Sequence, residues 1–482
     1  MSIVASGSAH TVLADSLSDR LLRELAAPRD IAALAVFRIL IGGLMCAGAL
    51  RFVRNGWIER LYVEPEFHFK YWGFSWVQVP SEFGLYLLYC GIALAAICVA
   101  IGLFYRVAII TFWCLFTYAE LMDVTTYLNH YYFISVLTLI MCFLSPHRAW
   151  SVDAWRRPAL RSQTLPAWQT HWVRFQVGLL YFYAGWAKFE IDWLLHAQPL
   201  NIWLPPHSGL PLLGPLLEQT WVHFAFSWFA FLFDTLIIGF MLWRPARPYA
   251  FLVILVFHYF THVFFNIGLF PFIMVFSVLI FFEADWPRKL ARLLRVPLAA
   301  RAAVTPANAP RRWSLGRALA TLAVVLFCAL QFLMPLRHWY YPGTVLWHEQ
   351  GMRFSWRVML REKSGSLEYR VALTRHDGTR RTVIVSPHRY LTEEQYREMA
   401  GQPDLILQLA HHIRDDYLAE GFATVEVYAQ SFVSLNGRLA HRMIDPAVDL
   451  ASTEFGLARA GWITSAPPEP PPLQRPLRLD RK

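Results

Sequence analysis

Charged residues are scarce in this sequence, and that scarcity excludes a soluble globular protein. Of the 482 residues only 16% are Asp, Glu, Lys or Arg, whereas 56% are hydrophobic and 16% are aromatic. Soluble domains carry about 25% charged residues. The composition therefore predicts an integral membrane protein whose solvent is the lipid bilayer.

Cysteine is also scarce, and its placement excludes a disulfide between the C-terminal third and the rest of the chain. All six cysteines lie in or beside apolar runs before residue 335: Cys46, Cys90, Cys98, Cys114, Cys142 and Cys328. They lack the spacing of metal ligands, so no metal centre is expected. The first thirty residues lack the continuous apolar core of a signal peptide, so the first spanning helix is expected to direct insertion.

The sequence contains instead apolar runs long enough to cross a bilayer. About 20 apolar residues span the hydrocarbon core as a helix, and these continuous runs favour helices. The predicted spans are Ile31–Leu50, Phe83–Leu103, Val107–Met122, Tyr131–Leu144, Val173–Phe189, Trp221–Trp243, Tyr249–Phe264, Leu269–Phe282 and Ala318–Met334. This gives about nine crossings. The alternative is eight, with a broken or re-entrant pair around Asn266-Ile267-Gly268.

Basic residues set the predicted orientation. They cluster before the first predicted span and after the fourth, sixth and eighth: Arg20, Arg23, Arg29, Arg148, Arg156, Arg157, Arg161, Arg244, Arg247, Arg288, Lys289, Arg292, Arg295, Arg301, Arg311 and Arg312. A nine-span protein places all four clusters on one side, which the positive-inside rule assigns to the cytoplasm. The N-terminus is therefore predicted to be cytoplasmic and the chain beyond Met334 exterior. Because topology explains much of the +10 net charge, no nucleic-acid partner is expected.

Beyond Pro335 the pattern changes to that of a small α+β domain. Three alternating segments predict strands: Phe354–Arg361, Leu367–Thr374 and Arg380–Val385. Thr392 and Gln395 have capping-box spacing, and the apolar residues of Leu405–Leu418 recur at helical spacing. Because this domain lies on the predicted exterior side, it serves either as a substrate-docking domain or as a cap without a ligand of its own.

The chain is expected to end in a β-hairpin and a Pro-rich tail. Asn436-Gly437 predicts a type I′ turn between Thr424–Leu435 and Arg438–Ile444. The predicted fold is mostly α: a polytopic transmembrane bundle of about eight or nine spans, followed by a small α+β exterior domain. The predicted segments are a cytoplasmic N-terminal segment (1–30), the transmembrane domain (31–336), the exterior domain (337–466) and a disordered tail (467–482).

Ionisable residues within the apolar runs mark candidate sites, because such groups usually face a bundle interior at a pathway or a reaction site. Lys188 ends the fifth run, and the segment from Asp123 to His130 forms the turn before the fourth. His258 and His262 lie four residues apart in the seventh run, on one predicted helix face. Two histidines without a third ligand are a weak indication of a metal site.

The topology places Lys188, His130 and His258 in the outer half of the bilayer. If their helices adjoin, they form a pocket at the level where a quinone head group would lie. The alternative is that Lys188 extends independently to the interface, as a single terminal lysine commonly does. Arg38 and Asp234, in the first and sixth runs, are expected to be structural partners.

Several motifs resemble the vitamin K-dependent γ-glutamyl carboxylases. The segment from Tyr181 to Trp193 reads YFYAGWAKFEIDW and resembles the family segment that ends in a catalytic lysine followed by an Asp-Trp pair. Lys188 takes the place of the lysine. Asp123 to His130 resembles a family loop whose histidine is functionally important, and His258 lies in another family element. Further similar motifs run through the chain from about residue 35 to 450: Phe37-Arg38, Gly102 to Arg106, Ser151 to Asp153, Trp286 to Leu290, Ser355-Trp356, Asn436 to Arg438 and Arg442 to Asp449.

The chain also departs from the family pattern. It cannot form the disulfide of the animal members, it has Ala187 where they carry a second lysine, and His262 has no family counterpart. It therefore resembles a compact prokaryotic-type member. These departures leave the protein substrate more open than the chemistry.

The resemblance implies an enzyme that oxidises a reduced naphthoquinone, reduced vitamin K or menaquinol, with oxygen to its epoxide. The base formed in that reaction removes a γ-proton from a peptide Glu on the exterior side, and carbon dioxide adds. Lys188 is the implied base, since burial penalises the ammonium form and favours a neutral amine. His130 would stabilise the quinol oxyanion. The implied substrate-binding residues are Asn129, His258, Asp123, Tyr181, Asp192 and Trp193.

Two other functions fit the same residues. A quinol epoxidase that lacks peptide carboxylation would need the same lysine. A non-enzymatic transporter or quinone carrier could use Lys188 and the histidines as a proton relay, although the two halves of the sequence show no internal repeat.

The sequence alone predicts that Lys188→Ala abolishes quinol epoxidation without loss of folding, because it removes the base, and that His130→Ala reduces it severely. Epoxide formation by the purified variants measures both effects. Epoxide formed by Lys188→Ala at the wild-type rate would contradict the assignment of the base.

Overall fold

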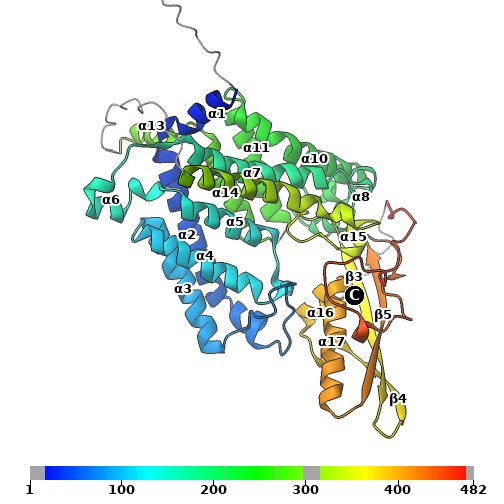
Figure 1. Cartoon of the computed structure of the whole chain (residues 1–482). Helices are drawn as coiled ribbons and strands as arrows, with labels where there is room; N and C mark the ends of the chain where they lie inside the picture. The colour runs from blue at the N-terminus through cyan, green and yellow to red at the C-terminus, as the bar shows by residue number, and fades with distance from the viewer. Residues whose placement is uncertain (1–16, 212, 266, 297–314, 474–482) are drawn as a thin grey trace, which may run out of the picture.

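The structure is a bundle of helices joined to a separate α+β domain (Figure 1). The computed structural model describes residues 17–211, 213–265, 267–296 and 315–473. The main helices of the bundle are α2 (Ala32–Arg54), α3 (Glu82–Ile101), α4 (Tyr105–Leu121), α5 (Asn129–Phe143), α7 (Ala167–Ala187), α10 (Thr220–Leu242), α11 (Arg247–Phe264), α12 (Phe270–Val278) and α14 (Leu315–Leu333). Each predicted span overlaps one of them.

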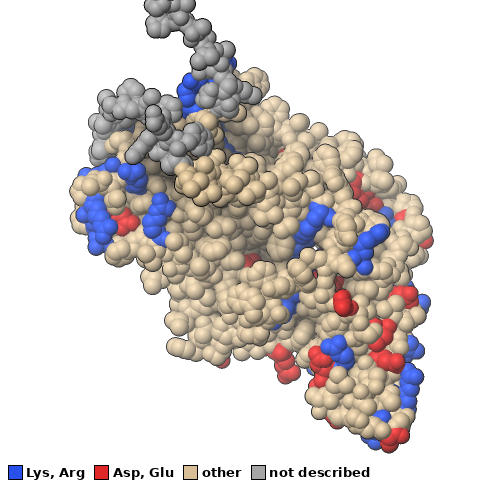
Figure 2. Space-filling model, viewed as in Figure 1, with Lys and Arg blue, Asp and Glu red and all other residues tan. Residues whose placement is uncertain are grey.

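Shorter elements connect or flank these helices. They are α1 (Leu17–Ala26), β1 (Pro28–Asp30), α6 (Val152–Arg156), β2 (Thr164–Pro166), α8 (Ile191–His196), α9 (Leu200–Trp203), α13 (Trp286–Leu293) and α15 (Val345–His348). Strands β1 and β2 pair antiparallel. Figure 2 shows Lys and Arg side chains over the end of the bundle that holds α6, charges of both signs over the C-terminal domain, and few charges between them.

Five described helices are long and apolar enough to cross a membrane: α2, α3, α10, α11 and Ala318–Tyr340, which includes most of α14. A sixth candidate arises if Phe270–Phe281 and α13, bent by 100° at their junction, form one span. By length and composition the described helices thus supply five or six spans rather than eight or nine. The reason is that α4 and α5 have only 17 and 15 residues, and α7 carries polar side chains such as the buried Gln176.

Close helix contacts fix the position of Arg38, and they correct its predicted partner. At Gly42 an added Cβ would lie 2.6 Å from the backbone nitrogen of Ala100, so α2 approaches the end of α3 closely. The fully buried Arg38 guanidinium donates to the carbonyls of Val99, Ala100 and Trp150. These include carbonyls at the C-terminus of α3, which have no partner within the helix. The predicted pairing of Arg38 with Asp234 is therefore wrong.

The C-terminal domain is an antiparallel sheet packed against two helices. Its strands β3 (Lys363–Thr374), β4 (Arg380–Val385), β5 (Thr424–Leu435) and β6 (His441–Arg442) follow the order β4-β3-β5-β6. Helices α16 (Glu393–Met399) and α17 (Pro403–Ala419) lie between β4 and β5 in the chain. The capping box of Thr392 and Gln395 is confirmed. Asn436 and Gly437 have φ values of 53° and 80°, as a type I′ turn requires.

The predicted strand Phe354–Arg361 is wrong. Phe354, Trp356 and Met359 have φ values of 61°, 58° and 55°, in the left-handed region, which a strand cannot contain. The segment instead forms turns that pack against the bundle, where the Trp356 ring stacks on Tyr132 with centroids 4.8 Å apart. It therefore contributes to the contact between the domain and the helices.

An ion pair fixes the C-terminal domain to the bundle. Arg438 donates through both terminal nitrogens to Asp192 of α8, at 2.6 and 2.7 Å, and Asn436 donates to the same carboxylate at 2.8 Å. Gln198 donates to the Pro472 carbonyl at 2.9 Å. Pro472 and Leu473 of the predicted disordered tail thus lie against the bundle, and residues 474–482 lie outside the described residues.

We expect Asp192→Ala to destabilise the protein by about 3 kcal/mol, because it leaves the largely buried Arg438 guanidinium without its counter-charge. Thermal unfolding in detergent measures the change. Arg389→Ala is the control. It removes an exposed partner of Asp416 and should change stability by less than about 1 kcal/mol.

The same contact should persist at neutral pH. Burial raises the pKa of Asp192, but hydrogen bonds from Arg438 and Asn436 outweigh burial and hold the pKa below its ordinary value. The stabilisation is therefore complete above about pH 4 and lost only as the pH falls through the lower folded-state pKa. Loss of the Asp192-dependent stability between pH 5 and 8 would contradict this account.

Candidate active site

An apolar cavity of about 380 Å³, here called the lysine cavity, lies between α7, α10, α11 and α12. Its walls are mainly aromatic and aliphatic, and its ionisable side chains are Tyr181, Lys188, Asp234 and His258. Few polar groups within an apolar pocket are typical of sites that bind and orient small molecules.

Lys188 is buried in this cavity and paired with a carboxylate. It follows the last residue of α7, and its Nζ donates to Asp234 Oδ2 at 2.7 Å and to the Ala184 carbonyl at 3.2 Å. The same nitrogen lies 5.3 Å from the centre of the Trp193 ring. The structure therefore gives Lys188 a carboxylate partner, whereas burial alone predicts an isolated neutral amine.

A glycine allows the pair to form. At Gly185 an added Cβ would lie 2.8 Å from the backbone nitrogen of Thr235, so α7 and α10 touch at this point. The contact brings Lys188, three residues later, within reach of Asp234, the residue before Thr235. Asp234 could not be predicted as the partner, because neither helix sequence alone reveals that α7 and α10 are adjacent.

A second polar pair lines the same cavity. The Tyr181 hydroxyl lies 3.0 Å from His258 Nε2, and His258 Nδ1 is buried without a hydrogen-bond partner. An unpaired buried nitrogen is uncommon, and it fits a site where a ligand supplies the partner. His262 does not join this pair: its side chain is exposed, with its ring 5.6 Å from that of Phe272. Among the described residues no group of three or more His, Cys, Asp and Glu could hold a metal.

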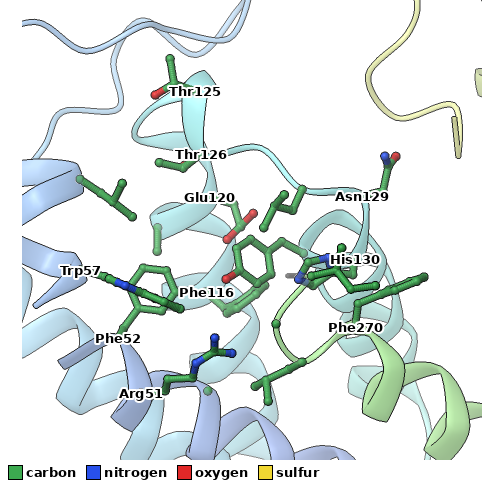
Figure 3. A pocket seen from close by; sticks show the side chains of 18 of the residues that line it. Arg51, Phe52, Trp57, Phe116, Glu120, Thr125, Thr126, Asn129, His130 and Phe270 are labelled. Carbon is green, nitrogen blue, oxygen red and sulfur yellow. The ribbon is translucent and has the colours of Figure 1, made fainter. Parts of the chain in front are cut away.

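A larger cavity of about 620 Å³, here called the arginine cavity, lies between α2, α4, α5 and the C-terminal domain. Figure 3 shows Arg51, Glu120 and His130 around it, with Phe52 and Trp57 on one side. Asn129 also lines it, and its side chain donates to the Arg357 carbonyl at 3.3 Å.

Helix α16 also lines the arginine cavity. Thr392, Glu394, Gln395, Arg397 and Glu398 of the C-terminal domain contribute to the lining there. Burial raises the pKa of the Glu398 carboxyl, which lies among these lining residues.

The wall between the cavities separates the two predicted histidines. Phe270, Val358 and Met359 line both cavities. The Phe270 ring lies 5.6 Å from the ring of His130 and 6.0 Å from that of His258. The structure therefore brings Lys188 and His258 together and places His130 across this wall, so the predicted single pocket is in fact two adjacent ones.

Two of the predicted substrate-binding residues, Asp123 and Asp192, already form hydrogen bonds with other side chains of the protein. Asp123 accepts hydrogen bonds from Thr125, His68 and Gln395, and neither it nor Asp192 lines the lysine cavity or the arginine cavity. Trp193 does line the lysine cavity. Arg51 and Glu120 also line the arginine cavity, although neither was predicted as a site residue. Arg51 was absent from the predicted basic clusters, although an ionisable residue at the end of an apolar run is the signal used for Lys188.

Comparison with known families assigns both parts of the chain. The family model described as the HTTM domain matches residues 26–286. This range includes Lys188 and Asp234 of the ion pair, as well as His130 and His258. The model described as the vitamin K-dependent gamma-carboxylase, lumenal domain, matches residues 316–469. The chain belongs to the vitamin K-dependent gamma-carboxylase family. It is a multi-pass membrane protein of that family with a lumenal-type C-terminal domain. No solved structure matches it.

The Lys188–Asp234 ion pair changes the stability expected of variants at Lys188. Lys188→Met leaves the Asp234 carboxylate buried without a partner, so we expect a loss of about 3–5 kcal/mol, whereas Lys188→Met with Asp234→Leu should recover most of it. Thermal unfolding of the purified variants in one detergent measures both. A single variant as stable as the wild type would show that the pair is not buried as described.

Proposed function

We propose that this protein is a membrane enzyme that oxidises a reduced naphthoquinone and couples the reaction to carboxylation of a peptide Glu with carbon dioxide. The observation that carries the proposal is the buried Lys188–Asp234 pair inside an apolar cavity. Membership of the vitamin K-dependent gamma-carboxylase family supports the choice of substrates.

The residues of the lysine cavity fit a reduced naphthoquinone, such as reduced vitamin K or menaquinol. Phe229, Phe257 and Phe270 offer faces for a flat aromatic ring, and about 380 Å³ is within the usual range of small-molecule sites. The unpaired Nδ1 of His258 could bond to one ring oxygen. A ring hydroxyl could then reach the Lys188–Asp234 pair.

The pair would act as the general base for that hydroxyl. Asp234 and Lys188 together carry no net charge when the amine is protonated and the carboxylate is not, so one further proton can be taken up by the carboxylate. The apolar walls exclude water and strengthen the electrostatic interactions of the pair with a developing oxyanion. When bound, the reduced quinone supplies the chemistry with oxygen that yields the epoxide and the strong base for the glutamyl γ-proton.

His130 then has a different role from the one that the sequence suggested. It lines the arginine cavity, against the wall that this cavity shares with the lysine cavity. We propose that it orients the glutamyl side chain in that cavity, with Asn129 beside it. No metal takes part in this scheme.

The proposed orientation places the N-terminus in the cytoplasm and the C-terminal domain outside. The support is the cluster of Lys and Arg at the end of the bundle that holds α6 (Figure 2), since basic residues collect on the cytoplasmic side. The glutamyl peptide would then arrive from the exterior side, where α16 meets the arginine cavity.

The proposal predicts that the double variant Lys188→Met, Asp234→Leu forms epoxide at least about 100-fold more slowly than the wild type, because it lacks the general base but remains folded. The assay supplies detergent-purified protein with reduced vitamin K, oxygen and labelled bicarbonate, with and without a Glu-containing peptide. His262→Phe, on the exposed side of α11, is the control and should keep full activity.

Each outcome of this assay separates one candidate function. Epoxide together with label in the peptide supports the full proposal. Epoxide without label identifies a quinol epoxidase that lacks carboxylation, and neither product from the wild type favours a quinone carrier. Wild-type epoxide formation by the double variant would overturn the role of the pair.

A further inference from the structure

Arg51 lines the arginine cavity beside Trp57. It lies in the last turn of α2, and its guanidinium carbon is 4.7 Å from the centre of the Trp57 ring. Among the described residues no Asp or Glu forms an ion pair with it, although Glu120 lines the same cavity. Figure 3 shows Arg51 and Glu120 on different sides of the open space. Within the described part of the chain, the cavity therefore contains an arginine that forms no ion pair.

The local backbone leaves room for the guanidinium. Gly268, between α11 and α12, has a φ of +60°, and an added Cβ there would lie 3.1 Å from Arg51 Nη1. A side chain at this position would be strained and would crowd the guanidinium. Trp57 supports one face of the guanidinium by a cation–π contact, which holds its plane while its N–H groups stay available.

The arginine cavity extends from Arg51 to the C-terminal domain. An ion pair between Arg60 and Glu394, 3.2 Å long, joins the bundle to α16 among the residues that line the cavity. His130 and the shared wall residue Phe270 also line it. A side chain that enters beside α16 could therefore reach both Arg51 and the wall that faces the lysine cavity.

We propose that Arg51 binds the side-chain carboxylate of a glutamyl residue presented by a peptide. The guanidinium offers two parallel N–H groups that match the two oxygens of a carboxylate, and this geometry distinguishes Glu from the uncharged Gln. The inference rests on the proposed function for the identity of the substrate, but it concerns binding alone. Arg51 thus sets the specificity of the arginine cavity and orients the glutamyl side chain beside His130.

The experiment measures binding of two synthetic peptides, identical except for one Glu or Gln, to the full-length protein in lipid nanodiscs. Fluorescence anisotropy of the labelled peptides gives the ratio of the two dissociation constants. We expect the wild type to bind the Glu peptide about 10- to 100-fold more tightly, as charged hydrogen bonds imply. Arg51→Gln should bring the ratio close to one, and Arg51→Lys should give an intermediate ratio. Arg54→Gln, on an exposed side chain of the same helix turn, should leave the ratio unchanged.

Two results would overturn the inference: a wild type that does not distinguish the peptides, or an Arg51→Gln variant that still does. Because loss of folding would weaken both peptides equally, only a selective loss for the Glu peptide supports it. Epoxide formation is measured in the same preparations. Selective binding without epoxide would refute the proposed function and support the carboxylate site at Arg51. Epoxide without selective binding would support the proposed function and refute the carboxylate site.

Discussion

The lysine cavity is organised around a buried ion pair, between Lys188 at the end of α7 and Asp234 of α10. Removing two charges from water is costly, and the mutual attraction offsets that cost only where the geometry is good and other hydrogen bonds assist. Here the Nζ–Oδ2 distance is 2.7 Å, and the Ala184 carbonyl accepts a further hydrogen bond. The contact of α7 with α10 at Gly185 makes this geometry available. Around the pair, aromatic walls keep the cavity apolar, so its few polar groups dominate what it can bind.

The second constraint is the division of the interior into two cavities. Phe270, Val358 and Met359 form the wall they share, and two of these residues belong to the turn segment before β3. The C-terminal domain therefore contributes both to the wall and, through α16, to the lining of the arginine cavity. The ion pair of Asp192 with Arg438 fixes this domain against the bundle. A residue that was expected at the substrate thus acts on the site by holding the domain in place.

Much of the fold could be predicted from the sequence, because it is encoded locally. Apolar runs located the nine main helices of the bundle in the described part of the chain, and the capping box at Thr392 and the turn at Asn436-Gly437 are where the pattern predicts them. The predicted strand at Phe354–Arg361 is wrong, because the alternation of apolar and polar residues does not reveal a backbone in the left-handed region. The burial of Lys188 and its place beside His258 followed the predicted convergence of helices. The ion-pair partner Asp234 and the separate cavity of His130 could not be predicted, because the adjacency of helices depends on close contacts such as those at Gly42 and Gly185.

We propose above all that a reduced naphthoquinone binds in the lysine cavity with a ring hydroxyl at the Lys188–Asp234 pair. The most direct measurement is a structure of the full chain in lipid nanodiscs with a bound naphthoquinone. The account predicts ring density among Phe229, Phe257 and Phe270, with one oxygen within hydrogen-bond distance of Lys188 or Asp234. Density confined to the arginine cavity or to the lipid-facing surface would contradict it.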